Sequence, residues 1–141
     1  RTIAVRLKQH EAHALEVATW LQTVPEVKRV LYPGLESHPG HDLAKTQMDG
    51  AFGAMLSFEV RGDLAAAKRV AESTKLFQLA VSLGAVESLI EQPASMSHAS
   101  YDAQLRQTHG IHDTLVRLSV GLEAFEDLRD DLQQALTRAV P

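Results

Sequence analysis

The segment TLVRLSVGLE, residues 114–123, carries the clearest strand pattern in the chain. Successive side chains of a strand point to opposite sides, so every second residue lies on the same face. One face of this segment is entirely apolar: Val116, Leu118, Val120 and Leu122. The other face holds Leu115, Arg117 and Ser119. We therefore expect a half-buried strand with an arginine at its middle.

The segments on either side of this strand alternate between helical and extended patterns. Two boundaries are marked by Pro25, which ends the first helix, and by Asp63, which is suited to cap the start of another. Apolar residues at helical spacing predict helices over residues 3–23, 41–48, 64–73, 101–108 and 124–139. Short alternating or apolar runs predict strands over residues 27–32, 54–60, 78–81, 85–90 and 114–123.

This order of elements predicts an α+β fold. Short strands separated by helices favour a small, mostly antiparallel or mixed sheet covered by helices on one face. A chain of 141 residues fits one domain with one hydrophobic core. We therefore expect residues 1–141 to form a single domain, with a long first helix in residues 1–23 and an α+β sandwich in residues 24–141.

Composition excludes several classes of function. The net charge is −4, so no basic face favours nucleic acid. No apolar run approaches the roughly 20 residues of a membrane span. The chain has no cysteine, which excludes disulfides, thiolate metal ligands and a cysteine nucleophile. We expect a cytoplasmic protein with no nucleic-acid or membrane partner.

Three polar clusters are better explained by structure than by chemistry. His10 and His13 are three residues apart, whereas a helical zinc-protease motif places its histidines four apart, so this helix predicts a solvated polar face. His38 and His41 lie in a turn without an evident third metal ligand. Lys75 follows a helix end, where the helix dipole favours a cation. We expect no metal site and no catalytic residue among them.

Arg117 and the Ser82-Leu83-Gly84 segment leave alternatives open. A mid-strand arginine can lie on a solvated face, form an internal ion pair, or present its planar guanidinium to a carboxylate. Ser82-Leu83-Gly84 reads as a tight turn, although glycine would also allow a ligand to approach the backbone closely. The pattern alone does not choose between these readings.

Several segments together resemble one family, the transsulfuration enzymes that use pyridoxal phosphate. The family includes cystathionine γ-synthase, cystathionine γ-lyase, cystathionine β-lyase and methionine γ-lyase, and the resemblance is to its C-terminal domain over essentially the whole chain. The segments are LYPGL and SHP within residues 31–39, LAKTQM at 43–48, FGAMLSF at 52–58, SLGAVESL at 82–89, PASMSHA at 93–99 and LVRLSVGLE at 115–123. The fold implied is the small domain of a fold-type I pyridoxal-phosphate enzyme.

The resemblance implies roles for individual residues. Arg117 matches the arginine that binds the substrate carboxylate, and Ser82, with Leu83 beside it, matches a segment that lines the substrate. Val81 takes a position that influences substrate preference, where several members that act on cystathionine carry a glutamate. Gly84 is followed by alanine, whereas the family often has a second glycine. The resemblance places the cofactor and its lysine in an N-terminal domain that this chain lacks.

The implied activity is formation or cleavage of a C–S bond in a sulfur amino acid, of the cystathionine γ-synthase or γ-lyase type. A methionine γ-lyase-like activity is the alternative, and a non-catalytic α+β interaction module is another. The chain begins with Arg1 rather than Met, which suggests a piece of a longer protein. We expect this piece to be inactive alone and to work with its own N-terminal domain in a homotetramer.

Overall fold

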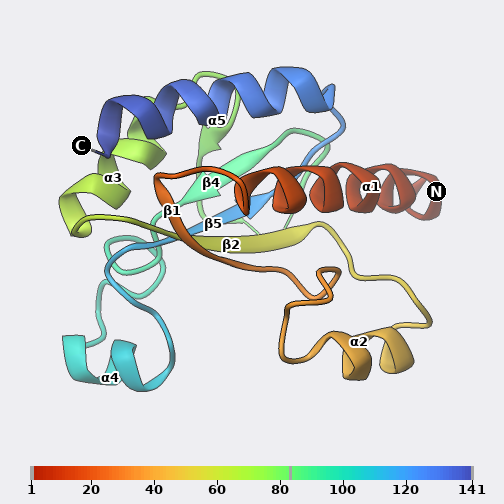
Figure 1. Cartoon of the computed structure of the whole chain (residues 1–141), viewed down its shortest axis with the longest axis horizontal. Helices are drawn as coiled ribbons and strands as arrows, with labels where there is room; N and C mark the ends of the chain where they lie inside the picture. Colours follow the sequence, from red (N-terminus) through yellow and green to blue (C-terminus); the bar gives the residue numbers. More distant parts are fainter. Residues whose placement is uncertain (1, 83, 141) are drawn as a thin grey trace.

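The computed structural model describes residues 2–82 and 84–140 of the chain (Figure 1). The helices are α1 (Ile3–Leu21), α2 (His41–Gln47), α3 (Leu64–Ser73), α4 (Ala103–Thr108) and α5 (Phe125–Ala139). The strands are β1 (Val27–Leu31), β2 (Met55–Val60), β3 (Gln78–Leu79), β4 (Leu89–Glu91) and β5 (Leu115–Ser119). The predicted α+β class is confirmed.

The strands form one sheet in the order β1-β2-β5-β4-β3. Neighbouring strands are antiparallel except at one edge, where β3 pairs with β4 in parallel through Gln78 and Leu89. The strand predicted from TLVRLSVGLE is therefore the central strand, hydrogen-bonded on both sides. Its position explains why it carries the clearest pattern, because one face of it lies in the core.

A layer of three helices covers one face of the sheet. Figure 1 shows α1, α3 and α5 on one side, whereas α2 and α4 lie on the other. α5 packs against both α1 and α3, and α1 and α3 also contact the sheet. The predicted apolar stripe of α5 is buried in this interface: Leu128, Leu132, Leu136 and Val140. From the sheet, Phe58, Val116 and Leu118 face the same core and are fully buried.

Local capping explains where two helices begin or end. The carboxylate of Asp63 accepts a hydrogen bond from the backbone N–H of Ala66 at 2.8 Å, so the predicted N-cap of α3 is confirmed. Gly110 has φ of +72° directly after α4, which is the left-handed conformation that glycine adopts readily at a helix end.

Three strand predictions were too long. The strands expected over residues 78–81 and 85–90 are β3 and β4, at Gln78–Leu79 and Leu89–Glu91. The strand expected over 114–123 ends at Ser119. The backbone N–H of Gly121 is then bound by the Ser88 hydroxyl at 2.8 Å, and Leu122, placed on the apolar face by its spacing, is 37% exposed.

The solvated face predicted for the first helix was wrong at His10. His10 is 6% exposed, and its Nδ1 lies 2.7 Å from the carbonyl oxygen of Val120. Glu11, on the same helix, accepts a hydrogen bond from the backbone N–H of Phe52 at 2.7 Å. These polar groups satisfy backbone atoms of segments that meet only in the folded chain, so helical spacing alone could not separate them from solvent-facing residues.

Candidate functional site

The centre of the candidate site is Arg117, in the middle of β5. Its register partners are Ser57 on β2 and Glu91 on β4. Side chains directly opposite each other in antiparallel strands lie on the same face of the sheet. Because Val116 and Leu118 point into the helix-covered core, Arg117 points to the opposite face, together with these two partners.

Two contacts hold the guanidinium of Arg117. Its Nη2 lies 3.1 Å from Oε1 of Glu91 and donates a hydrogen bond to the carbonyl oxygen of Ser82 at 2.9 Å. Both contacts use the same nitrogen. Within the described residues, Nη1 and Nε make no hydrogen bond or ion pair, and the side chain is 23% exposed. The guanidinium is thus held at Nη2, whereas the N–H groups of Nη1 and Nε have no partner among the described residues.

The carboxylate of Glu91 is buried beneath this arginine. Its side chain is 1% exposed, and Oε1 also accepts a hydrogen bond from the hydroxyl of Ser97 at 3.0 Å. Oε2 is buried without a hydrogen-bond partner among the described residues. The Ser97 hydroxyl lies 2.9 Å from Nδ1 of His98. The result is a chain of polar contacts from His98 through Ser97 and Glu91 to Arg117.

The structure brings two of the predicted substrate-binding residues together, because the Ser82 carbonyl bonds to Arg117. The Ser82 hydroxyl accepts a hydrogen bond from the N–H of Gly84 at 3.3 Å. Gly84 has φ of +133°, a backbone conformation that residues other than glycine rarely adopt. Val81 is 56% exposed and makes no ion pair or side-chain hydrogen bond. Leu83, the remaining predicted residue, lies outside the described residues.

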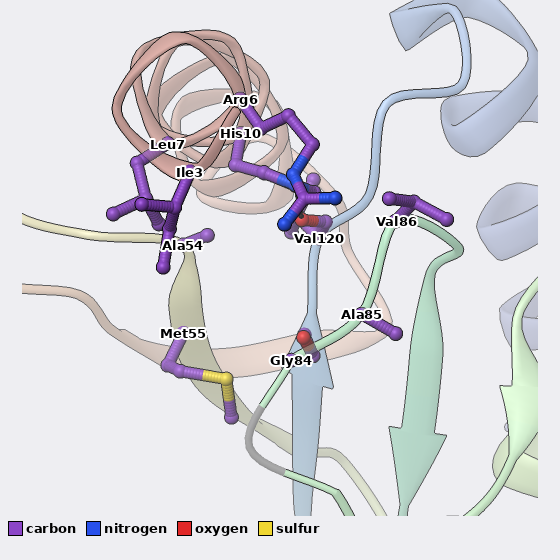
Figure 2. Close-up of a pocket in the computed structure, with 11 residues that line it drawn as sticks. Ile3, Arg6, Leu7, His10, Ala54, Met55, Gly84, Ala85, Val86 and Val120 are labelled. Carbon is purple, nitrogen blue, oxygen red and sulfur yellow. Dashed lines mark hydrogen bonds between the residues drawn. The ribbon is translucent and has the colours of Figure 1, made fainter. Parts of the chain in front are cut away.

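A cavity of about 410 Å³ lies close to this segment. Figure 2 shows it between the first turns of α1, the start of β2 and residues 84–86. Most of its lining is apolar, and Arg6 and His10 contribute its charged or titratable side chains. Neither Arg117, Ser82 nor Val81 lines it. Ser119 and Met55, which pair across β5 and β2, connect the cavity to the face that carries Arg117.

The two histidines in the turn at residues 38–41 make local contacts. His38 accepts a hydrogen bond from the N–H of Gly40, and His41 bonds to the carbonyl oxygen of Pro33 and stacks on Phe52. Across residues 2–82 and 84–140, no group of three or more histidine, aspartate or glutamate side chains could hold a metal ion. In the same residues, no helix is both long and apolar enough to cross a membrane.

A family model described as Cys/Met metabolism PLP-dependent enzyme matches residues 1–137. The chain belongs to this family. The match spans all the segments that resemble the transsulfuration enzymes, so the predicted family is confirmed. Arg117 and Ser82 lie in two of these segments, LVRLSVGLE and SLGAVESL.

Members of the Cys/Met metabolism family with high identity to this chain carry different names. Cystathionine β-lyase of Coxiella burnetii is 54% identical over 96% of the chain, and mouse (Mus musculus) cystathionine γ-lyase is 51% identical over 100%. L-methionine γ-lyase of Fusobacterium nucleatum is 49% identical over 98%. The chain spans only 35% of the length of each of these relatives.

A solved structure of a family member has the same fold. The crystal structure of metB from Corynebacterium glutamicum matches with a TM-score of 0.89 and 48% identity. The match covers 97% of this chain and 34% of that one. The α+β arrangement is therefore that of one part of a longer family member.

The family is pyridoxal-phosphate-dependent. A lysine that forms an imine with the cofactor needs burial or a cationic neighbour to lower its pKa. The lysines here are all exposed: Lys8, Lys28, Lys45, Lys68 and Lys75. None of them fits this role.

Sequence reasoning missed Glu91 and Ser97 as parts of the site. Both contact residues that are distant in sequence, and a glutamate after a short apolar strand has no spacing that identifies its partner. One signal was present in the sequence. Glu91 directly follows Leu89 and Ile90, the apolar end of a predicted strand, and a charge that is buried there requires a compensating group. The mid-strand arginine was the natural candidate.

Proposed function

We propose that this chain is the C-terminal, substrate-binding domain of a longer pyridoxal-phosphate-dependent enzyme that forms or cleaves a C–S bond in a sulfur amino acid. In this proposal Arg117 binds the α-carboxylate of the substrate. The cofactor and its lysine would come from residues outside this chain, and the 141-residue piece would be inactive alone.

The observation that carries the proposal is the hydrogen bonding and exposure of Arg117. It is held through Nη2, its side chain is partly exposed, and the N–H groups of Nη1 and Nε have no partner among the described residues. Two parallel N–H donors of a guanidinium match the two oxygens of a carboxylate, which gives a bidentate contact that a lysine cannot make. Each such pair of donors includes Nη2, so a substrate carboxylate would share Nη2 with the contacts to Glu91 and Ser82. Such a contact fixes the orientation of an amino acid as well as its affinity.

The test uses the full-length enzyme that contains this chain. Arg117→Ala is expected to raise the KM for L-cystathionine about 100-fold, because a charge-assisted bidentate contact is lost. Cofactor content, read from the visible absorption spectrum, should stay unchanged. Arg117→Lys keeps the positive charge but lacks the paired N–H donors, so its KM should lie between those of the parent enzyme and Arg117→Ala. An unchanged KM in Arg117→Ala would overturn the proposal.

The type of C–S chemistry is a finer proposal. We infer a cystathionine γ-synthase or γ-lyase type. The methionine γ-lyase type is the second candidate, because the apolar Val81 takes the position that the resemblance links to substrate preference. Relatives with both kinds of name have similar identity to this chain. The rates of turnover of L-cystathionine and L-methionine by the full-length enzyme distinguish the two. A non-catalytic module would turn over neither.

A further inference from the structure

The environment of Glu91 is unusual for a carboxylate. Its side chain is 1% exposed, and burial of a charge costs free energy unless partners compensate it. Arg117 and the Ser97 hydroxyl both contact Oε1, whereas Oε2 is buried without a partner among the described residues.

In the contact between Glu91 and Arg117, the arginine is partly exposed to solvent and the glutamate is buried. The Arg117 side chain is 23% exposed and the Glu91 side chain is 1% exposed, so a ligand from solvent can reach the arginine but not the glutamate. Glu91 faces Arg117 directly in the strand register, and the Ser82 carbonyl contacts the same Nη2. These two contacts restrict the long arginine side chain, whose rotamer freedom would otherwise be lost on binding.

We propose that Glu91 is a positioning residue that holds the Arg117 guanidinium in the orientation that binds a substrate carboxylate. Ser97 supports it by fixing Oε1. This inference rests on the proposed function of Arg117. Glu91 does not contact the substrate itself, and its contribution is to the orientation and pre-organisation of the arginine.

Removal of the charge of Glu91 has two effects of opposite sign on affinity. Loss of the ion pair frees the arginine side chain, which weakens binding of a carboxylate. Loss of a nearby negative charge also leaves the arginine more positive, which strengthens that binding. A positioning role requires the first effect to exceed the second. The direction of the change in KM therefore decides between them.

The first experiment compares Glu91→Gln with Glu59→Gln in the full-length holoenzyme. Glu59 on β2 is the matched control, because it is also buried, also has one oxygen without a hydrogen bond, and contacts Lys28 and His112 instead of Arg117. Glu91→Gln should raise the KM for L-cystathionine about tenfold and change kcat little. Glu59→Gln should leave KM unchanged. An unchanged or lowered KM in Glu91→Gln would overturn the inference.

The second experiment asks whether the effect acts on the carboxylate. L-methionine and L-methioninamide differ only at that group, and both can be measured as competitive inhibitors of L-cystathionine turnover. Glu91→Gln should weaken inhibition by methionine about tenfold and leave inhibition by methioninamide unchanged. Equal weakening of both would indicate a general structural defect and would overturn the inference. If Glu91→Gln does not fold, Ser97→Ala should show the same pattern with a smaller change.

The last comparison separates this inference from the proposed function. In an Arg117→Ala background, Glu91→Gln should raise KM no further, because the group that it positions is gone. If Arg117→Ala raises KM and Glu91→Gln does not, only the positioning role of Glu91 fails. If Arg117→Ala itself leaves KM unchanged, the proposed function fails, and the inference fails with it.

Discussion

Glu123 binds Ser88 through both oxygens of its carboxylate. Oε1 accepts a hydrogen bond from the Ser88 N–H and Oε2 accepts one from the Ser88 hydroxyl, both at 2.8 Å. That hydroxyl in turn accepts from the N–H of Gly121. A Cβ atom at Gly121 would lie 2.6 Å from the Ser88 nitrogen, so only glycine permits this close approach. The arrangement ties the end of the segment that begins at Ser82 to the end of β5.

Glu123→Ala is therefore expected to destabilise the chain and to loosen residues 84–88. Ser88 is fully buried, so the loss of Glu123 leaves the N–H and the O–H of Ser88 without an acceptor, at a cost of about 2–3 kcal/mol. Urea unfolding measures the change. Glu126→Ala, an exposed glutamate in the first turn of α5, is the control and should change stability by less than about 0.5 kcal/mol. Equal effects of the two variants would contradict the role given to Glu123.

Asp131 connects α5 to the loop that follows α3. Its carboxylate accepts hydrogen bonds from the backbone N–H groups of Lys75, Leu76 and Phe77, at 2.8, 2.8 and 3.0 Å. Asp131→Ala should lower the free energy of unfolding by about 3 kcal/mol, because buried donors lose a charged acceptor. Asp130→Ala removes an exposed carboxylate that pairs with Arg129 at the surface, and it should have little effect. Similar unfolding curves for the two variants would contradict this prediction.

The buried Tyr32 is expected to make the folded chain less stable at high pH. Burial, together with the nearby carboxylate of Glu11, raises the pKa of the Tyr32 phenol above its ordinary value. The folded chain therefore holds this proton more tightly than the unfolded chain does. The stabilisation is fully present below the unfolded pKa of about 10 and is lost as the pH rises above it.

Tyr32→Phe tests this sign. At neutral pH it should cost about 1 kcal/mol, because the phenol donates a hydrogen bond to the Gly53 carbonyl at 2.8 Å. Above pH of about 10 the difference from the parent chain should shrink, because the variant cannot ionise at this position. Urea unfolding at a series of pH values measures it. Tyr101→Phe, at an exposed tyrosine, should leave the pH profile unchanged.

Val81 offers a test of substrate preference. Its exposed side chain directly precedes Ser82, whose carbonyl binds Arg117. A glutamate there would place a negative charge close to the proposed substrate position. In the full-length enzyme, Val81→Glu should raise the ratio of cystathionine to methionine turnover several-fold, since only cystathionine carries a second ammonium group that this charge can attract. Val81→Gln keeps the size without the charge, and an equal ratio in both variants would remove the electrostatic explanation.

The elements that the sequence predicts well are those whose signal is local. The alternation of residues 54–60, the cap at Asp63 and the stripe from Leu128 to Val140 each depend on neighbours a few residues apart, and the structure confirms all three. Arg117 was identified as unusual because a charge interrupts a strong strand pattern. The resemblance to the family then gave it a role, which remains a prediction.

What the sequence could not predict depends on long-range hydrogen bonds. The sequence predicts residues 85–88 as part of a strand, yet the Leu122 N–H bonds to the Val86 carbonyl and the Glu123 carboxylate accepts from the Ser88 N–H. These partners lie 35 residues away in the case of Ser88 and Glu123, and no period reveals them. His10 and Glu91 are similar cases, because each is a polar residue buried against a partner from a distant element.

The central position of β5 has a consequence for the order of events during synthesis on the ribosome. β1 and β2 are available early and can pair as neighbours, but β4 has no antiparallel partner until residues 115–119 have been made. The β3–β4 pair is short, and a two-stranded unit has little stability alone. The contacts of Arg117 and the complete sheet therefore form in the same late step, and a nascent chain stalled before β5 would expose unpaired strands to chaperones and to aggregation.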